Sequence, residues 1–244
     1  MNFKRPRSLK DKITHYCPGC GHGVVHRLVA EVIDELRIRR KTVGIAPVGC
    51  AVLAYDYWDF DVSEAAHGRA LAVATGIKRV RPDLVVFSYQ GDGDLAAIGT
   101  AETLHAANRA ENLTCIFINN ACYGMTGAQM APTTAIGQKT ATTPGGRSPQ
   151  EGDGYPLIIS ELLARLRGVC FVERTTVITP SDVLKTKKAI LKAFLNQINK
   201  RGFSLVEVLS PCPTGWGLSP QKAAEFIKEK LSREFPLGVI KDEA

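Results

Sequence analysis

The chain has 244 residues, of which 45% are hydrophobic and 23% are charged, and its formal net charge is +7. These fractions are ordinary for a globular protein, and the 22 glycines and 13 prolines exclude a collagen-like or low-complexity chain. No apolar run reaches the ~18 residues that a membrane helix needs, and the basic start is not followed by the apolar stretch of a signal peptide. We therefore expect a cytoplasmic protein with no membrane partner.

Helix and strand patterns alternate from the first third of the chain onward. Helical spacing of apolar residues marks 22–37, 65–81, 95–110, 156–167, 181–200 and 220–233. Apolar runs of strand type mark 42–48, 83–90, 113–120, 171–175 and 204–209. The stretch 121–153 has little periodicity and reads as a long functional loop. The alternation predicts an α/β fold with a mostly parallel sheet flanked by helices, which we treat as one domain over residues 1–244.

Residues with distinctive chemistry follow the predicted strands. Cys50 follows the first strand, Gly91–Asp94 the second, Asn119-Asn120 the third and Cys212 the last. In parallel sheets, ligands bind beyond the carboxyl ends of the strands. The sequence therefore places its candidate chemistry at one edge of the predicted sheet.

Seven cysteines, an odd number, argue against a disulfide framework. Cys17-Pro-Gly-Cys20 is a turn that lets two thiolates converge, whereas Cys50 and Cys212 are single and distant. Thiolates select zinc or iron–sulfur clusters, and one close pair departs from the two pairs of a common zinc site. This pattern favours a [4Fe–4S] cluster held by several loops, with zinc or a redox dithiol as alternatives. Two cysteines within apolar runs are expected in the core: Cys115 and Cys170.

The triplet Gly91-Asp92-Gly93 lies between a strand and a helix. Its glycines permit close approach of a phosphate, and Asp92 offers the hard oxygen that Mg²⁺ prefers. Asn119-Asn120 follows Gly93 after 25 residues, so Asn120 is a candidate second ligand and the Cys122 carbonyl a third. An ordinary turn is the alternative for the triplet alone. Together, the two motifs resemble the thiamine diphosphate signature, in which Mg²⁺ bridges the cofactor's diphosphate to the protein.

The motifs as a set resemble one family over about residues 13–215, namely the β subunit of 2-oxoacid:ferredoxin oxidoreductases. The matching motifs are Cys17-Pro-Gly-Cys20-Gly21-His22, Gly49-Cys50, His67-Gly68-Arg69-Ala70, Gly91-Asp92-Gly93-Asp94, Ile98-Gly99, Asn119-Asn120, Tyr123-Gly124-Met125-Thr126-Gly127, Pro132-Thr133-Thr134 and Ser210-Pro211-Cys212. The resemblance implies a CoA-dependent oxidative decarboxylation of a 2-oxoacid to an acyl-CoA and CO₂. The electrons would pass through a [4Fe–4S] cluster to ferredoxin.

The resemblance also implies roles for individual residues. Cys17, Cys20, Cys50 and Cys212 match the cluster ligands. Asp92, Asn120 and the Cys122 carbonyl match the magnesium ligands. The other cofactor-binding matches are Gly49, Cys50, His67, Gly91, Gly93, Asp94, Tyr123, Gly124, Met125 and Thr126, and the catalytic matches are His67, Met125 and Leu53.

The family also implies partners. The glutamate that activates thiamine lies on the α subunit, so the active site should be shared between chains. Further clusters would sit on other subunits, such as γ and δ subunits, because this chain has no ferredoxin-like cysteine run.

The resemblance also implies that Leu53 and Met125 face the substrate. Both side chains are apolar, so neither offers a positive charge to pair with a second carboxylate at the far end of the substrate. This favours a branched-chain or other apolar 2-oxoacid over 2-oxoglutarate or pyruvate.

Two other functions compete with this interpretation. One is a non-redox thiamine diphosphate decarboxylase or carboligase with zinc at the cysteines. The other is a basic scaffold that binds nucleic acid or a protein, since residues 42–165 hold 8 basic and 12 acidic side chains and the positive charge lies outside them. The chain has no nucleic-acid-binding motif, so we expect no nucleic acid partner.

Overall fold

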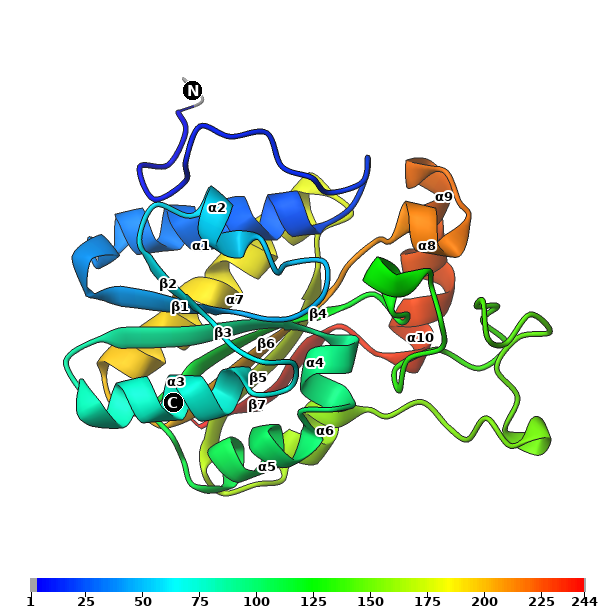
Figure 1. Cartoon of the computed structure of the whole chain (residues 1–244). Helices are drawn as coiled ribbons and strands as arrows, with labels where there is room; N and C mark the ends of the chain where they lie inside the picture. The colour runs from blue at the N-terminus through cyan, green and yellow to red at the C-terminus, as the bar shows by residue number, and fades with distance from the viewer. Residues whose placement is uncertain (1–3, 244) are drawn as a thin grey trace.

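The computed structural model describes residues 4–243 and builds them around a seven-stranded sheet of order β2-β1-β3-β4-β6-β5-β7 (Figure 1). The strands are β1 Thr42–Ala46, β2 Asp61–Glu64, β3 Val85–Gly91, β4 Thr114–Asn119, β5 Val169–Thr176, β6 Phe203–Leu209 and β7 Gly238–Asp242. Neighbouring strands are parallel except for β7, which runs antiparallel to β5. The predicted α/β fold with a mostly parallel sheet is confirmed.

Helices cover both faces of the sheet (Figure 1). One face carries α1 His22–Glu35, α2 Ala54–Tyr57 and α7 Pro180–Ile198, and the other carries α3 Ala70–Val80, α5 Thr100–Asn108 and α6 Ile159–Ala164. The remaining short helices are α4 Asp92–Ala96, α8 Pro213–Trp216, α9 Pro220–Phe226 and α10 Ser232–Glu234. None of these described helices is both long enough and apolar enough to cross a membrane.

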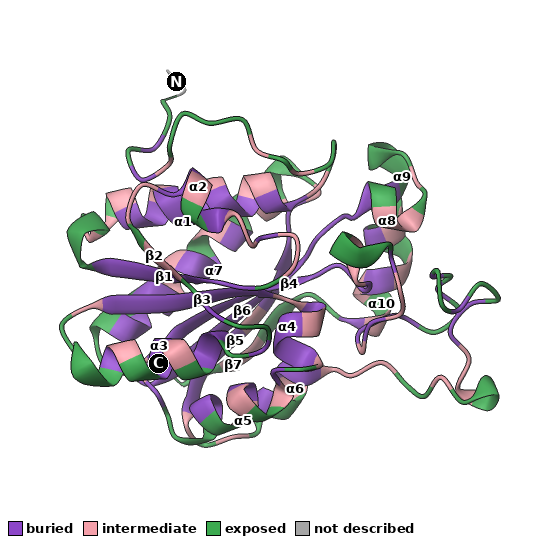
Figure 2. Cartoon of the chain, in the orientation of Figure 1, coloured by how far each residue is buried: buried purple, intermediate pink, exposed green. Residues whose placement is uncertain are grey.

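The core has two layers because successive strand residues point to opposite faces. In β4, Ile116 and Ile118 pack with α1 and α7, whereas Cys115 and Phe117 pack with the helices of the other face. The central strands are buried along their length (Figure 2), as a sheet covered on both faces requires. Cys115 and Cys170 are buried in these layers, as expected from the sequence.

Several elements differ from the sequence prediction. The expected helix 65–81 begins at Ala70, because residues before it form a turn whose Gly68 N–H donates to Asp94 Oδ1 at 2.9 Å. The expected helix 95–110 is split into α4 and α5, because the chain at Gly99 packs directly on the backbone of Gly68. The short α2 and α8 and the edge strands β2 and β7 were not predicted. Both edge strands have exposed and half-buried residues, so they lack the apolar runs that mark the inner strands.

The loop between β4 and α6 forms an arm that extends away from the sheet (Figure 1, green). Arg147 is 5% exposed and holds this arm together; two short 3-10 turns, Gly124–Thr126 and Pro149–Glu151, interrupt its irregular path. Its guanidinium donates to the carbonyl oxygens of Ala131, Pro132, Thr134, Asp153, Gly154 and Tyr155. These bonds join residues 131–134 to residues 153–155, so the predicted irregular loop has a defined shape.

His26 of α1 is buried against the end of α2. The ring of His26 stacks on Trp58 with centroids 4.2 Å apart, and its Nε2 lies 3.0 Å from the Tyr16 hydroxyl. Nδ1 has no hydrogen-bond partner among the described residues. Burial lowers the pKa of His26 well below its usual 6.5, with the nearby His22 and His15 acting in the same direction.

This buried ring predicts a pH-dependent stability. An unfolded histidine titrates near ~6.5, so below that pH the unfolded chain binds a proton that folded His26 does not. We expect the free energy of unfolding to fall by up to about 1.4 kcal/mol per pH unit from this group as the pH drops below ~6.5. In His26→Phe that slope should become shallower in denaturant titrations between pH 7 and 5, whereas substitution of the exposed His105 by Asn should leave it unchanged. An equal slope in the native chain and His26→Phe would contradict the assignment.

Candidate functional site

The order of the strands aligns the candidate residues along one edge. β1, β3, β4 and β6 are neighbours in the sheet. Cys50, Asp92, Asn120 and Cys212 each follow one of these strands, in that order. The carboxyl ends of parallel strands lie at the same edge, so residues far apart in sequence converge there.

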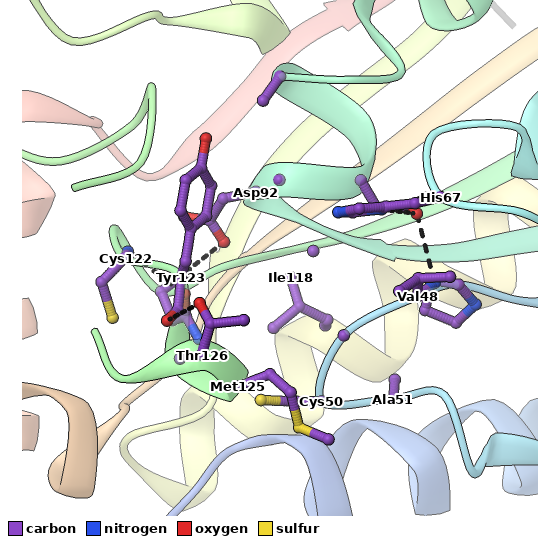
Figure 3. A pocket seen from close by; sticks show the side chains of 18 of the residues that line it. Val48, Cys50, Ala51, His67, Asp92, Ile118, Cys122, Tyr123, Met125 and Thr126 are labelled. Carbon is purple, nitrogen blue, oxygen red and sulfur yellow. Dashed lines mark hydrogen bonds and ion pairs between the residues drawn. The ribbon is translucent and has the colours of Figure 1, made fainter. Parts of the chain in front are cut away.

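A pocket of about 280 Å³ opens at this edge (Figure 3). Every residue that the sequence suggested for cofactor binding lines it: Gly49, Cys50, His67, Gly91, Asp92, Gly93, Asp94, Asn120, Cys122, Tyr123, Gly124, Met125 and Thr126. In the view of Figure 3, Asp92 and Tyr123 lie on one side of Ile118 and His67 on the other, with Cys50 and Met125 below. The pocket has the size and mixed polarity of a small-molecule site.

Some residues lie differently from expectation. Leu53 is half-buried at the start of α2 and does not line the pocket, so only Met125 of the two apolar substrate candidates does. His22 belongs to the Cys17–His22 motif but has no role assigned from the sequence, and it is buried and lines the pocket. Its Nδ1 lies 2.9 Å from the Tyr89 hydroxyl, and burial lowers its pKa to about 3. Four apolar lining residues have no role assigned from the sequence, and only Ile98 among them falls in one of the matching motifs: Val48, Ala51, Ile98 and Ile118.

Asp92 is a buried carboxylate with few partners. It starts α4, is 3% exposed, and accepts hydrogen bonds from the Thr133 hydroxyl at 2.5 Å and the Asn120 N–H at 3.3 Å. Burial raises the pKa of Asp92 to about 7, while the bonds from Thr133 and Asn120 act in the opposite direction. No cationic side chain lines the pocket beside it, so a bound cation would stabilise its charged form.

Three oxygen-bearing groups meet beside Asp92. One terminal atom of the Asn120 amide lies 2.6 Å from the Cys122 carbonyl oxygen and 3.0 Å from Asp92 Oδ1. If that atom is nitrogen, the amide donates to both oxygens. If the amide turns, three oxygens converge and need a cation between them. Carboxylate, amide and carbonyl oxygens are the ligands of Mg²⁺, so this donor set fits that ion.

Asp94 supports the rim of the pocket. Its Oδ1 accepts from the N–H of Gly68 at 2.9 Å and lies 2.7 Å from Nδ1 of His67, and its Oδ2 accepts from Gln90 Nε2 at 2.6 Å. A carboxylate only accepts, so Nδ1 of His67 carries the proton and Nε2 is left to act toward the pocket. Asp94 is 1% exposed with both oxygens occupied, which makes it a support for His67.

The Cys17–Cys20 turn packs against the start of α9. Gly19 has a φ of +79°, and a Cβ there would lie 2.7 Å from Pro220 Cβ, so glycine is required for the fit. Burial raises the pKa of Cys20 to about 11, and the nearby sulfurs of Cys212 and Cys17 add to this. The turn is therefore close to Cys212, although their positions in sequence are far apart.

Two more cysteines converge on Gly124. A Cβ on Gly124 would lie 3.3 Å from the Cys212 sulfur and 3.5 Å from the Cys50 sulfur. Burial raises the pKa of Cys50 to about 12, and the charges of Cys212, Cys20 and Cys17 raise it further by smaller amounts. Four cysteine thiols from different loops thus come into one region, and thiolates are the ligands that an iron–sulfur cluster takes. They do not converge on one point, since among residues 4–243 no three His, Cys, Asp or Glu side chains are grouped closely enough to hold a single metal ion.

Comparisons with known proteins show the family to which the chain belongs. Residues 48–208 match the C-terminal TPP-binding domain of thiamine pyrophosphate enzymes. The chain is 50% identical over 240 residues to ketoisovalerate oxidoreductase subunit VorA of Methanothermobacter marburgensis, covering 98% of this chain and 50% of that protein. It is 38% identical over 220 residues to 2-oxoglutarate synthase subunit KorB of Archaeoglobus fulgidus, covering 90% and 78% of the two chains. This chain belongs to the thiamine diphosphate-binding subunits of the 2-oxoacid:ferredoxin oxidoreductase family.

A solved structure supports the same family. The 2-oxoglutarate:ferredoxin oxidoreductase from Magnetococcus marinus, solved with 2-oxoglutarate, coenzyme A and succinyl-CoA bound, matches with a TM-score of 0.79 at 26% identity. The match covers 100% of this chain and 86% of that one. By contrast, the chain spans about half the length of the ketoisovalerate oxidoreductase subunits that it matches.

Behind the pocket, a buried ionic network holds the turn that carries Asn120. Asn119 donates from Nδ2 to Glu207 Oε1 at 2.7 Å, and its Oδ1 accepts from the N–H of Ala121 at 3.1 Å. Arg174 Nε donates to Glu207 Oε2 at 2.7 Å, and the Ser160 hydroxyl donates to the same oxygen at 2.5 Å. In a thiamine diphosphate-binding subunit, this network is the support for the residues beside Asp92.

The donor set predicts the effect of removing Asp92. We expect Asp92→Ala to abolish magnesium-dependent binding of thiamine diphosphate, because the Asn120 and Cys122 oxygens alone carry no full negative charge for the cation. Calorimetric titration of thiamine diphosphate in excess Mg²⁺ measures this. Asp83→Ala is the control, because that carboxylate is exposed and pairs with Arg81. Retained binding in Asp92→Ala would remove this residue from the magnesium ligands.

Proposed function

We propose that the chain is the thiamine diphosphate-binding subunit of a CoA-dependent 2-oxoacid:ferredoxin oxidoreductase, and that it works as one domain. One observation carries the proposal: oxygen ligands for Mg²⁺ and cysteine sulfurs surround the same Gly124 segment. A Cβ on Gly124 would lie within 3.5 Å of the sulfurs of Cys212 and Cys50 and of the Asn120 amide. An enzyme that decarboxylates a 2-oxoacid and removes electrons needs these two groups close together.

The magnesium and diphosphate would be held at the strand ends. Asp92, the Asn120 side chain and the Cys122 carbonyl would bind Mg²⁺, and the backbone of Gly91–Gly93 at the start of α4 would bind the diphosphate. Thr126, whose hydroxyl now donates to Gln129 Oε1 at 2.5 Å, would turn toward the diphosphate. Bound thiamine diphosphate supplies the electron sink that lets a 2-oxoacid lose CO₂.

A [4Fe–4S] cluster would be held by Cys17, Cys20, Cys50 and Cys212. It would accept electrons and pass them to ferredoxin. Three observations support this: the family implies such a cluster, the sulfurs of Cys50 and Cys212 lie beside Gly124, and the charges of Cys20 and Cys17 act on Cys50. Cys122 is the fifth sulfur in this neighbourhood and contributes its carbonyl to the magnesium instead.

The substrate that we propose is 2-oxoisovalerate or a similar apolar 2-oxoacid. The pocket walls include Val48, Ala51, Ile98, Ile118 and Met125, and no lysine or arginine lines them. An apolar wall favours a branched side chain over a second carboxylate. Identity to the ketoisovalerate subunit is also higher than to the 2-oxoglutarate subunit, at 50% against 38%.

A partner subunit completes the proposed site. No glutamate lines the pocket, so the acid that activates thiamine would come from an α subunit. Ferredoxin, coenzyme A and the 2-oxoacid are the other proposed partners, and γ and δ subunits would hold any further clusters.

The direct test is chemical analysis of the complex purified without oxygen. We expect about four irons, matching sulfide and one thiamine diphosphate per chain, and fastest ferredoxin reduction with 2-oxoisovalerate in a panel of 2-oxoacids. Zinc without iron would replace the proposal by a non-redox thiamine enzyme. Absence of both metal and cofactor would contradict it altogether.

The space at Gly124 gives a specific prediction. We expect Gly124→Ala to lower the iron and sulfide content, because the added methyl group would occupy the space between the sulfurs of Cys212 and Cys50. Gly23→Ala is the matched control, because a Cβ there meets nothing within 4 Å. Both variants should keep the native circular dichroism spectrum. Full iron content in Gly124→Ala would show that the cluster lies elsewhere.

His67 is predicted to hold or move a proton at Nε2. We expect His67→Gln to lower kcat by roughly 10²–10⁴-fold, the usual range for a lost acid–base group, with little change in thiamine diphosphate affinity. Steady-state assays of ferredoxin reduction by the native and variant complexes, with thiamine diphosphate affinity measured by titration, check this. An unchanged kcat would leave His67 as a purely structural residue.

A further inference from the structure

The loop that carries Cys212 contacts the turn that carries Asn120. Trp216 lies at the end of α8, one turn after Cys212, and its backbone N–H donates to the Cys212 carbonyl at 2.9 Å. Its indole Nε1–H donates to the backbone carbonyl of Asn120 at 3.0 Å. One residue is thus bonded to a proposed cluster ligand at one end and to a proposed magnesium ligand at the other.

The indole cannot shift easily from this position. Its ring packs on Phe226 of α9, with centroids 4.9 Å apart, and also against the small cluster of Cys122, Ala128 and Cys212. It is half-buried, so the hydrogen bond is shielded from water on one side. Displacement of the Cys212 loop would therefore break the bond to Asn120 or move that carbonyl.

A second contact joins the same two segments. The sulfurs of Cys122 and Cys212 lie near each other, in one small buried cluster with Ala128. Both sulfurs lie close to Gly215, where a Cβ would be 2.8 Å from Cys212 Sγ and 3.3 Å from Cys122 Sγ. Cys122 is 2% exposed and its carbonyl faces Asn120, so this side chain links the magnesium side to the cluster side.

We propose that Trp216 is a positioning residue that couples the two cofactor sites, so that loading the cluster strengthens binding of thiamine diphosphate. The inference rests on the proposed function. A cluster bound by Cys212 would fix the α8 turn, and the indole of Trp216 would then fix the Asn120 carbonyl. The magnesium ligands would therefore lose less conformational freedom when thiamine diphosphate binds than they do without the cluster. By linkage, thiamine diphosphate strengthens retention of the cluster by the same factor.

The magnitude follows from a single shielded hydrogen bond. Such a bond contributes about 1 kcal/mol net, which corresponds to about fivefold in affinity. The coupling is therefore large enough to measure by titration and too small to decide folding. Cys122 should contribute a smaller share, because its sulfur only packs against that of Cys212.

The test uses the complete complex purified without oxygen, freed of thiamine diphosphate, with the cluster either retained or removed by a chelator. The dissociation constant of thiamine diphosphate in excess Mg²⁺ is measured in both forms. We expect the native complex to bind about fivefold more weakly without the cluster. In Trp216→Phe, which keeps the aromatic packing but loses the N–H, the two constants should become nearly equal.

Trp58→Phe is the matched control. The Trp58 indole also donates to a backbone carbonyl, that of His26 at 3.1 Å, but Trp58 does not line the pocket. It should keep the native ratio of the two constants. Cys122→Ala is a second variant, in case the aromatic substitution lowers the yield of folded protein. It should reduce the ratio while retaining full iron, because only the carbonyl of residue 122 is a proposed ligand.

The outcomes separate the coupling from the function beneath it. A native complex that binds iron and thiamine diphosphate with no effect of one on the other overturns the coupling and leaves the function intact. A Trp216→Phe complex with the native ratio also overturns it. A complex with neither iron nor thiamine diphosphate contradicts the proposed function, and the coupling with it.

Discussion

The turn between Asn119 and Cys122 depends on a charge that is buried behind it. Glu207 is 1% exposed and pairs with the fully buried Arg174, which also pairs with Glu161. Removing Arg174 should cost about 3–5 kcal/mol, because the buried Glu207 would be left without a compensating charge. Glu207 uses its second oxygen to hold the Asn119 amide, and that amide holds Ala121 at a φ of +54°. The left-handed conformation costs roughly 1–2 kcal/mol in a residue with a Cβ, and it lies in the turn that brings the Cys122 carbonyl oxygen to 2.6 Å from the Asn120 amide.

The same turn also anchors the arm. The carbonyl of Ala121 accepts from the Thr134 hydroxyl at 2.7 Å and from Gln138 Nε2 at 3.0 Å, both at the base of the arm. Thr133 of the same segment donates to Asp92. Arg147 holds these residues in place by bonding the Thr134 carbonyl at 2.6 Å. The geometry of the proposed magnesium site therefore depends equally on the sheet behind it and on an irregular segment beside it.

Much of the sheet and most of the pocket could be predicted from sequence, because both follow from local patterns. Apolar runs located the inner strands, and the rule that ligands bind at strand ends placed Asp92, Asn120 and Cys50 together at one edge. The exposed edge strands β2 and β7 have no such runs. The break between α4 and α5 arises from contact between Gly99 and Gly68, which are 31 residues apart in sequence. Glu207 bonds Asn119, 88 positions away, and Trp216 bonds Asn120, 96 positions away. No sequence motif indicates either contact.

The charges of the pocket lining indicate which groups a partner chain would have to supply. The groups that it would bind, a diphosphate and a 2-oxoacid, are anions, yet its lining includes two aspartates and no lysine or arginine. Magnesium can balance Asp92 and the diphosphate, but nothing among the lining residues pairs with the carboxylate of the substrate. The apolar side chains at the mouth, Ile98 and Met125, are 50% and 56% exposed, as expected for residues that another chain covers. The proposed α subunit would therefore have to bring both the cover and the positive charge, while this chain would position the metal, the electron acceptor and the proton at His67.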